Sequence, residues 1–268
     1  IEAMHAYAKG QELQRQGKHK EATEAYQLAV DKDPDFGRAY SGLASSYQNI
    51  GQREKALKNI QQAVARLDKM TDREKFRTRG VYYLMMDNWK KAIDEYSMLV
   101  NEFPADDAGL ANLAMAYWGI NDFQMAIKYC QDALRLRPKA ITYRNLAQYA
   151  LEAGDFKLAE ESAQKAIEIN PEYSQAYLYL AKAQIDAGRY EDGERTWQKY
   201  GTFGTGMERG MEAGLLQLAL YESRLKDAVS ILERGILSDL ENKEKNSDYL
   251  AAKKRLILAE VLILQKRE

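Results

Sequence analysis

The side chains best suited to covalent or metal chemistry are few and isolated in this sequence. The chain has two His residues, His5 and His19, and a single Cys, Cys130. A metal site needs several ligands at a defined spacing, and a nucleophile needs a base that activates it. His5 has no second His, Cys or carboxylate at such a spacing, and one Cys excludes an internal disulfide. We therefore expect no metal site and no cofactor, and we interpret Cys130 as a small buried hydrophobic residue.

A glycine-rich stretch, GTFGTG at residues 201–206, is the remaining candidate for binding a phosphate. Loops that cradle phosphates follow the order G-x-G-x-x-G after a strand, or end in G-K-S/T, and this stretch does neither. We interpret it as a flexible connector. The V-A-I-K lysine, H-R-D and D-F-G motifs of a protein kinase are also absent from these residues. The sequence therefore predicts a protein that is not an enzyme and has no catalytic residues.

The composition favours a globular protein without a dedicated charged partner. The 268 residues are 46% hydrophobic and 29% charged, with a formal net charge of −1. This balance argues against a nucleic-acid or membrane-surface binder. The longest apolar run, residues 256–264, is too short to cross a membrane. The chain starts at Ile1 with a helical pattern already under way, so we expect it to be a segment of a longer protein.

An eighteen-residue pattern recurs along the chain, for example as GKHKEATEAYQLAVDKDP at 17–34 and NDFQMAIKYCQDALRLRP at 121–138. Its first position suits a turn with left-handed backbone geometry and holds Gly17, Gly51, Asp87, Asn121, Gly154 and Gly188. Its sixth position is small: Ala22, Ala56, Ala92, Ala126, Ala159 and Gly193. Its tenth position lies on the same helical face and holds Tyr26, Ile60, Tyr96, Cys130, Ala163 and Trp197. The four prolines, at 34, 104, 138 and 171, are separated by 70, 34 and 33 residues, which indicates stacked repeats.

Other repeat positions predict a helix, a turn, a second helix and another turn in every unit. The third position of the pattern is expected to pack at the turn between helices, and it holds His19, Trp89, Phe123, Phe156, Tyr190 and Leu225. A second helical stretch precedes each copy, with a small residue seven positions before the turn: Gly10, Ala44, Gly80, Ala114, Ala147 and Ala181. The longer connection before the third unit can form a capping box between Thr71 and Glu74.

This unit resembles the tetratricopeptide repeat. The fourth unit matches the family pattern almost throughout, at Leu110, Leu113, Ala114, Tyr117, Asn121, Ala126, Ala133 and Pro138. The resemblance implies an all-α, right-handed superhelical solenoid of about seven stacked antiparallel helix pairs. Units that start at Ala3, Gly37, Arg73, Asp107, Ala140 and Ser174 account for six repeats over residues 1–200. A degenerate seventh unit at 201–240 and an additional helix at 241–268 are expected to follow, the latter either a cap or a truncated eighth unit.

The resemblance also implies where a partner binds, because repeat positions 2, 5, 9 and 12 line the concave groove of this family. From those positions we predict a partner-binding groove formed by Tyr7, Gln11, Arg38, Gln48, Arg77, Met115, Trp118, Arg144, Gln148 and Lys182. Arg38, Arg77, Arg144 and Lys182 outnumber the one acid at groove positions, Glu74. We expect a mildly cationic groove with an apolar centre, suited to an extended segment with acidic residues. The alternative is that these cations are merely solvated.

Protein–protein interaction is the function that this pattern favours, with a peptide or partner segment in the concave groove. The clamp by which related chaperone adaptors hold a C-terminal carboxylate is not expected, since its Lys and Asn positions hold Tyr7 and Gln11 here. A looser resemblance, to the repeat regions of bacterial eukaryotic-like Ser/Thr kinases, implies a regulatory or sensor role in a signalling protein. A repeat that reads single-stranded RNA is the less favoured alternative.

Two further points stay open in the sequence. An apolar helix at the end of the stack allows self-association, which would make a second copy of the chain a partner. The compartment is not specified: cytoplasmic is the default, and an extracytoplasmic position follows only if the parent protein is a membrane-anchored kinase.

Overall fold

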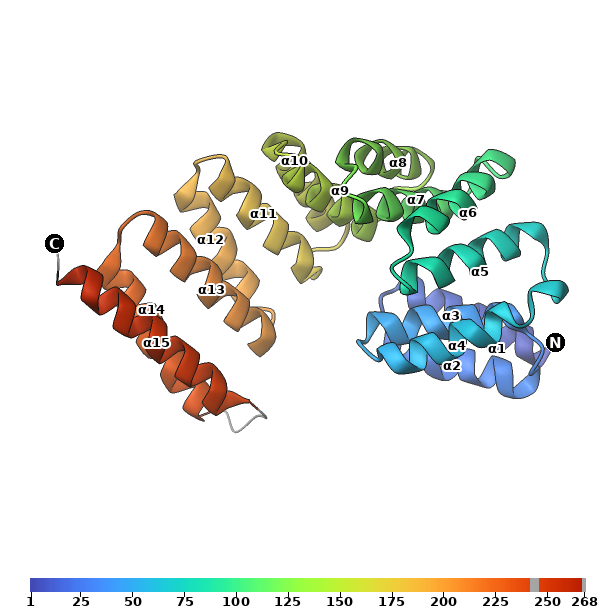
Figure 1. Ribbon diagram of the computed structural model, residues 1–268, viewed down its shortest axis with the longest axis horizontal. Helices are drawn as coiled ribbons and strands as arrows, with labels where there is room; N and C mark the ends of the chain where they lie inside the picture. The colour runs from blue at the N-terminus through green and yellow to red at the C-terminus, as the bar shows by residue number, and fades with distance from the viewer. Residues whose placement is uncertain (242–245, 267–268) are drawn as a thin grey trace. The chain divides into compact units, whose positions relative to one another are not determined.

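The computed structural model describes residues 1–241 and 246–266, and within them the chain is helical, with no strand (Figure 1). By their contacts the residues fall into two compact units, Ile1–Pro138 and Lys139–Glu268. The first unit contains α1 (Glu2–Arg15), α2 (His19–Lys32), α3 (Gly37–Asn49), α4 (Arg53–Val64), η1 (Leu67–Lys69), α5 (Asp72–Met85), α6 (Trp89–Glu102), α7 (Asp107–Gly119) and α8 (Phe123–Leu136). The second contains α9 (Ala140–Glu152), α10 (Phe156–Ile169), α11 (Ser174–Asp186), α12 (Tyr190–Gly201), α13 (Thr205–Tyr221), α14 (Leu225–Glu241) and α15 (Ser247–Gln265).

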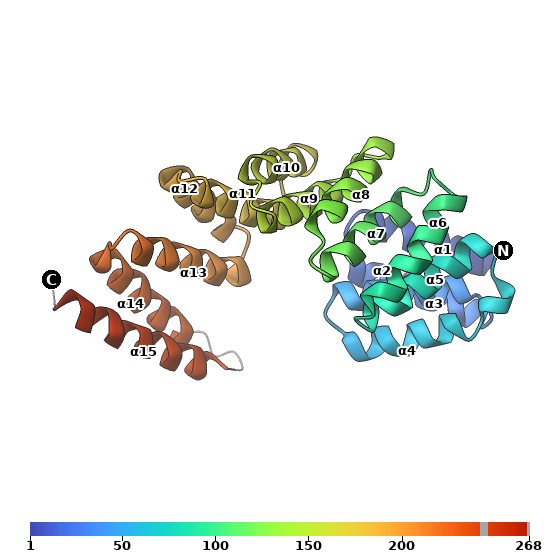
Figure 2. The ribbon, with the colours of Figure 1, turned by 45° about the horizontal axis from the view of Figure 1, so that its top comes forward.

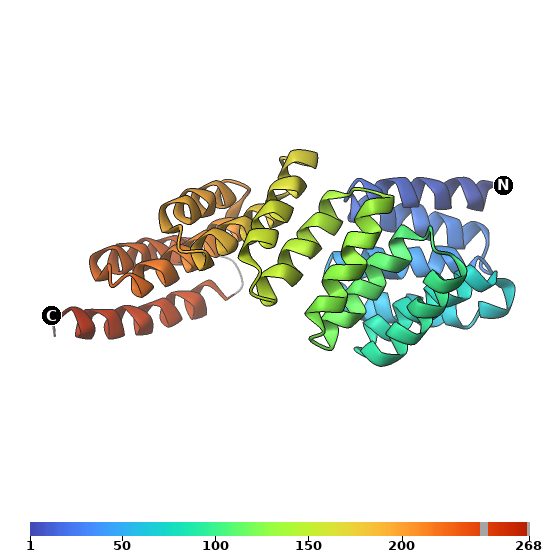
Figure 3. The same cartoon turned by 90° about the horizontal axis from the view of Figure 1, so that it is seen from above.

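Consecutive helices pack as antiparallel pairs, and the pairs stack on one another within each unit. In the first unit each helix contacts the next one along the chain, and α1, α3, α5 and α7 also contact each other in that order (Figure 3). In the second unit α9 contacts α11 as well as α10, and α14 packs along α15 (Figure 2). The expected all-α solenoid of stacked helix pairs is therefore confirmed.

The turns inside the helix pairs have the left-handed backbone that the sequence predicts. The first position of the repeat has a positive φ in all six copies, including 53° at Asp87 and 62° at Asn121. The same position in the seventh pair is Ser223, with a φ of 55°. The turn geometry is thus common to all seven pairs, although only some of them place Gly there.

The core of each pair is built from the small and large repeat positions. Every Ala at the sixth position is fully buried, and the tenth-position side chains, Cys130 among them, are at most 5% exposed. Close approach explains the small residues in the preceding helix: a Cβ at Gly80 would lie 2.5 Å from the ring of Tyr96. The interpretation of Cys130 as a buried core residue is confirmed.

The third repeat position, which was expected to pack at the turn between helices, contacts the next pair. The ring Nδ1 of His19 lies 3.4 Å from the side-chain amide nitrogen of Asn49, and a Cβ at Gly119 would meet the indole of Trp89 at 2.3 Å. Tyr190 contacts Tyr221 with ring centroids 5.7 Å apart. Asn49, Gly119 and Tyr221 occupy equivalent places near the end of the next first helix, so this contact sets the stacking of successive pairs.

Two expectations about connections have different outcomes. The capping box is present: the Thr71 N–H donates to Glu74 at 3.0 Å at the start of α5. The glycine-rich stretch is a shorter connector than its composition suggests, because Gly201 ends α12 and Thr205 begins α13. Phe203, inside that connector, packs on Tyr177 with ring centroids 5.0 Å apart. The intervening residues are therefore held by an aromatic contact.

The last predicted segment, 241–268, includes residues 242–245 and 267–268, which lie outside the described residues. Its described part forms α15. Across residues 1–241 and 246–266 no helix combines the length and apolar character that a bilayer span requires. Within the same residues no group of three His, Cys, Asp or Glu side chains is arranged to hold a metal ion. The division into six units, a seventh and a final helix stays a prediction.

Candidate functional site

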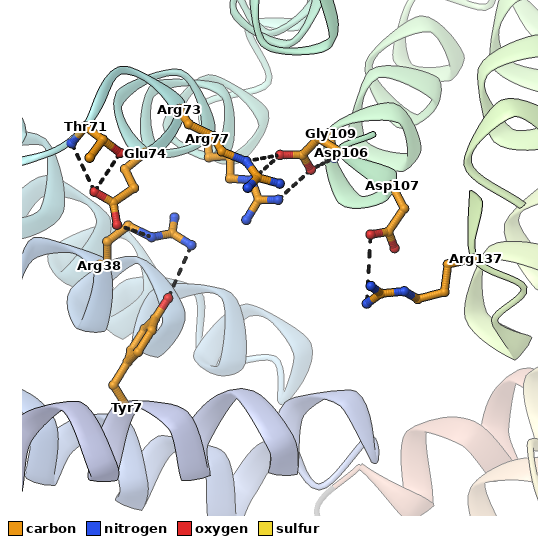
Figure 4. A network of polar contacts seen from close by, with 10 residues as sticks. All are labelled: Tyr7, Arg38, Thr71, Arg73, Glu74, Arg77, Asp106, Asp107, Gly109 and Arg137. Carbon is orange, nitrogen blue, oxygen red and sulfur yellow. Dashed lines mark hydrogen bonds and ion pairs between the residues drawn. The ribbon is translucent and has the colours of Figure 1, made fainter. Parts of the chain in front are cut away.

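Three predicted groove residues of the first unit meet in one polar cluster. Tyr7 and Gln11 lie one turn apart on α1, and the Gln11 amide donates to the Tyr7 hydroxyl at 3.0 Å. Arg38, on α3, donates to the same hydroxyl at 3.3 Å. The Arg38 guanidinium also faces Glu74 of α5, with Nε 3.7 Å from the carboxylate (Figure 4). The first helices of three successive pairs thus contribute to this cluster.

A second cluster, next to the first along α5, is centred on a buried carboxylate. Asp106 is the N-cap of α7 and its side chain is 0% exposed. Arg77 donates to both of its oxygens, from Nε at 2.8 Å and from Nη2 at 2.5 Å. Arg73 adds a contact at 2.9 Å, and the Gly109 N–H adds one at 2.8 Å (Figure 4). Asp106 therefore joins the start of α7 to α5.

These contacts decide the charge state of Asp106. Burial on its own would raise the pKa of the Asp106 carboxyl, but the hydrogen bonds from Arg77 and the Gly109 N–H and the charge of Arg77 hold that pKa below its ordinary value. The carboxylate is ionised near neutral pH and cancels most of the charge of one arginine.

The two clusters together carry little free positive charge. Three arginines, Arg38, Arg73 and Arg77, face two carboxylates, Glu74 and Asp106, so one positive charge remains in excess. At the other end of the network Arg137 lies 4.0 Å from Asp107 (Figure 4). The two clusters are thus weakly cationic, because each of their arginines already faces a carboxylate of the chain.

The second unit brings two predicted groove residues over one aromatic ring, and a third, Gln148, accepts a hydrogen bond from one of them. Arg144 of α9 and Lys182 of α11 lie over the ring of Tyr179, at 6.0 Å and 5.9 Å from its centroid. Arg144 donates to the Tyr173 hydroxyl at 3.2 Å and to the Gln148 side chain at 3.4 Å. We call Arg144, Gln148, Tyr173, Tyr179 and Lys182 the α9–α11 cluster.

Among the described residues, the nearest contacts of Arg144 and Lys182 are with neutral groups, and a carboxylate lies beside the cluster, because Gln148 donates to Glu152 at 3.1 Å. Lys182 influences Asp186, one turn further along α11: burial raises the pKa of the Asp186 carboxyl, and the Lys182 charge offsets part of that rise without an ion pair. Burial also raises the pKa of Tyr179, so its hydroxyl stays neutral between the two cations.

Arg77 and Arg144 occupy the same repeat position and make the same kind of contact in their separate units. Each is the fifth residue of its predicted unit, and each donates to the side chain 29 residues further on. That partner is the aspartate Asp106 for Arg77 and the phenol Tyr173 for Arg144. The Asp106 carboxylate neutralises the charge of Arg77, whereas the neutral Tyr173 phenol does not neutralise the charge of Arg144.

The remaining predicted groove residues lie outside these clusters. Gln48 is exposed on α3, and Met115 and Trp118 are half-buried on α7. Their role in binding, like that of the whole groove set, stays a prediction.

The sequence pattern missed Asp106, Tyr173 and Tyr179 as site residues. Asp106 and Tyr173 precede their first helices by one residue, outside the four groove positions, and Tyr179 is at the sixth. The sequence does contain a signal for Asp106. It is an acidic N-cap candidate shortly after Pro104, and two arginines four residues apart, Arg73 and Arg77, lie about one repeat before it. For Tyr173 the only signal is that it occupies the position equivalent to Asp106.

Comparison with protein families decides what this architecture is. Models of the tetratricopeptide repeat match residues 7–68, 106–172 and 150–200. The chain belongs to the tetratricopeptide repeat family. The predicted resemblance to this family is thereby confirmed, and no catalytic family is indicated for these residues.

Curated relatives share only part of their length with this repeat protein. Human tetratricopeptide repeat protein 6 is 28% identical over 131 residues, which cover 48% of this chain and 24% of that protein. The mitochondrial import receptor subunit TOM70 of Saccharomyces cerevisiae is 37% identical over 67 residues, 25% of this chain and 11% of that protein. The chain thus spans a quarter or less of the curated relatives it matches.

Solved structures share the fold. A chain of the APC/C hetero-tetramer Cut9–Hcn1 superposes with a TM-score of 0.60 at 19% identity, over 78% of this chain and 42% of that chain. TTC0263, a repeat protein of Thermus thermophilus, has a TM-score of 0.56 at 18% identity, over 68% of this chain and 99% of its own. A fold of this family is consistent with a scaffold for protein–protein interactions, since stacked pairs present extended surfaces.

Proposed function

We propose that this repeat protein is a non-enzymatic scaffold that binds an extended protein segment rich in acidic residues. We further propose that the α9–α11 cluster contacts the acidic side chains of that segment. The groove of the first unit, which includes Tyr7, Arg38 and Arg77, would contribute shape and apolar contact more than charge.

The observation that supports this assignment is the different acceptor at one repeat position. Arg77 already donates to both oxygens of a carboxylate, Asp106, from Nε and Nη2. Arg144 has a phenol and an amide instead. An arginine presents five N–H donors, and the contacts of Arg144 leave donors that no carboxylate occupies. An incoming Asp or Glu side chain would supply the missing negative charge.

The aromatic ring strengthens the case for recognition at this point. Arg144 and Lys182 both lie about 6 Å from the centroid of the Tyr179 ring, so two positive charges are placed at one aromatic side chain. Arginine and tyrosine are also the residue types that dominate the energy of protein interfaces. A carboxylate bound here would relieve the repulsion and gain charge-assisted hydrogen bonds.

A matched pair of substitutions at Tyr173 tests the proposal. Tyr173→Asp places a carboxylate beside Arg144, as Asp106 does beside Arg77, and Tyr173→Asn gives a side chain of the same size without the charge. Tyr173 is the N-cap of α11 and makes no side-chain cap hydrogen bond. Asp and Asn are both favoured N-cap residues, so neither variant is expected to weaken the helix start.

The measurement is fluorescence anisotropy with two labelled twelve-residue probes, one alternating Glu and Leu and the other alternating Lys and Leu. We expect the wild type to bind the Glu probe in a salt-sensitive manner and to ignore the Lys probe. Tyr173→Asp should weaken Glu-probe binding about tenfold, and Tyr173→Asn should change it little. Arg144→Glu/Lys182→Glu should abolish binding, whereas Lys128→Glu/Lys226→Glu, with the same net charge change on α8 and α14, should not.

If Tyr173→Asp and Tyr173→Asn bind the Glu probe equally well, the α9–α11 cluster is not part of the binding site. If the wild type does not prefer the Glu probe, the proposal that the ligand is acidic is wrong. TOM70, which shares 37% identity with part of this chain, is named as a receptor subunit, which agrees in general terms with a protein ligand. The parent kinase and the bacterial signalling context stay predictions, because no observation on these residues favours them.

A further inference from the structure

Two carboxylates lie further along the helices that carry the α9–α11 cluster. On α9, Arg144 donates to Gln148 at 3.4 Å, and the Gln148 amide donates in turn to Glu152 at 3.1 Å. On α11, Asp186 follows Lys182 by four residues, which is about one helical turn. Each of the two helices therefore carries a cation and, one or two turns closer to its C-terminal end, an acidic side chain.

The charges of the two carboxylates are coupled to the cluster. Burial raises the pKa of the Tyr179 hydroxyl, the charge of Arg144 lowers it, and the charge of Glu152 raises it. Burial also raises the pKa of the Asp186 carboxyl, and the charge of Lys182 lowers it. Because α9 packs against α11, two positive and two negative side chains lie along one pair of neighbouring helices.

Stacking of the helix pairs does not require these acids. They occupy the thirteenth residue of the fifth and sixth predicted units. In the first four units the same position holds Arg15, Asn49, Met85 and Gly119, none of which is acidic. Glu152 and Asp186 are also exposed, so a partner can reach them. The order of cation and acid along α9 and α11 is therefore a property of this surface and not of the repeat.

The separation of the charges suits an extended chain. Arg144 and Glu152 are eight residues apart, or about 12 Å along α9, and Lys182 and Asp186 are four apart, or about 6 Å along α11. An extended chain rises about 3.3 Å per residue and places alternate side chains on the same side. Its side chains two and four residues apart are thus separated by about 7 Å and about 13 Å and share one side. Both separations match those on the two helices.

We propose that the α9–α11 cluster binds, together with Glu152 and Asp186, an extended segment of mixed charge. In that segment an acidic and a basic side chain lie on the same side, two or four residues apart. The acidic side chain contacts Arg144 and Lys182, and the basic one contacts Glu152 and Asp186. This inference rests on the proposed function and specifies its ligand further, because a segment with acids alone would set like charges against these two carboxylates.

Two more twelve-residue probes, of identical composition, test the mixed-charge ligand by fluorescence anisotropy. The same-side probe, ELELELKLKLKL, keeps its acids and bases on one side of an extended chain. The opposite-side probe, ELELELLKLKLK, moves the bases to the other side. We expect the wild type to bind the same-side probe about fivefold more tightly than the opposite-side probe or the Glu probe. Both probes are also measured with their sequences reversed, since a segment can run in either direction along the helices, and the tighter direction of each is compared.

Removal of the two acids should abolish this preference. Glu152→Gln/Asp186→Asn keeps the size of both side chains, and an amide oxygen at position 152 can still accept from Gln148. This variant should bind the same-side and Glu probes equally, and the Glu probe more tightly than the wild type does. Glu161→Gln/Glu191→Gln, with the same change in net charge at exposed acids of α10 and α12, should keep the wild-type preference.

The outcomes separate this inference from the proposed function. A wild type that binds the same-side and Glu probes equally overturns the mixed-charge ligand alone and leaves the α9–α11 cluster as a site for acidic side chains. A preference that persists in Glu152→Gln/Asp186→Asn has the same meaning. A wild type that binds neither probe overturns both proposals.

Discussion

Arg77 donates hydrogen bonds to both oxygens of the Asp106 carboxylate, 29 residues away along the chain, from Nε at 2.8 Å and from Nη2 at 2.5 Å. The carboxylate is fully buried and also caps α7 through the Gly109 N–H. One side chain therefore holds the orientation of a groove arginine and the start of the next first helix. Arg77, which is predicted to bind a partner, is therefore also part of the internal framework.

Asp106→Asn is expected to lower the free energy of unfolding by about 3 kcal/mol, because it leaves two arginines facing a neutral group at a buried site. Urea denaturation followed by circular dichroism measures the change. Asp35→Asn is the matched control: Asp35 pairs with Lys69 at 2.6 Å but is exposed, so little loss is expected there. Equal effects of the two substitutions would show that the buried contact is not a main stabilising interaction.

The same carboxylate predicts how the stability responds to acid. The pKa of Asp106 is lower in the folded protein than in the unfolded chain, where its ordinary value is 3.8. As pH falls, the unfolded chain takes up the proton first, so the contribution of Asp106 is complete above pH 3.8 and is lost as pH drops towards the folded-state pKa. The stability difference between wild type and Asp106→Asn should therefore stay constant from neutral pH to about 5 and shrink below 4. A difference that is the same at all pH values would contradict this assignment.

The sequence predicts the repeat architecture well because each signal is local. The left-handed turns at Asp87 and Asn121, the capping box of Thr71 and Glu74 and the buried Cys130 each depend on residues within one helix pair. Short-range spacing is enough to specify them.

The charge of the groove could not be predicted in the same way. The count of groove cations included Arg77 but not Asp106, whose contact requires α5 to pack beside the start of α7. An Asp in that place is already explained as an N-cap, so nothing in the sequence demands a second role. Whether Arg144 meets a carboxylate or a phenol likewise depends on the register between neighbouring first helices, which the pattern specifies only to within a residue or two.

Gly80→Ala is expected to cost about 1–3 kcal/mol, because its Cβ would lie 2.5 Å from the ring of the fully buried Tyr96. Gly206→Ala is the control: it also lies in a helix, but no heavy atom would come within 4 Å of its Cβ, so stability should stay the same or rise slightly. Thermal and urea unfolding of the two variants measure the difference. If Gly80→Ala proves neutral, the Tyr96 ring can move aside, and the small residue is not needed for close packing of the pair.

Ser223 offers a substitution that should stabilise the protein. It has a φ of 55° at a turn where the other six pairs place Gly, Asn or Asp. A left-handed backbone costs an ordinary L-residue about 1–2 kcal/mol, so Ser223→Gly should raise the free energy of unfolding by about 0.5–1 kcal/mol after the greater flexibility of the unfolded chain is subtracted. Ser223→Asn should do as well, since Asn121 adopts the same geometry with a φ of 62°. The reverse change, Gly154→Ser, should lower stability, because φ is 78° there and open space surrounds the Cβ position. Urea denaturation of the three variants should therefore show a higher free energy of unfolding for the Ser223 variants and a lower one for Gly154→Ser. If the free energy of unfolding changes in the same direction at both turns, contacts of the Ser223 side chain outweigh its backbone strain.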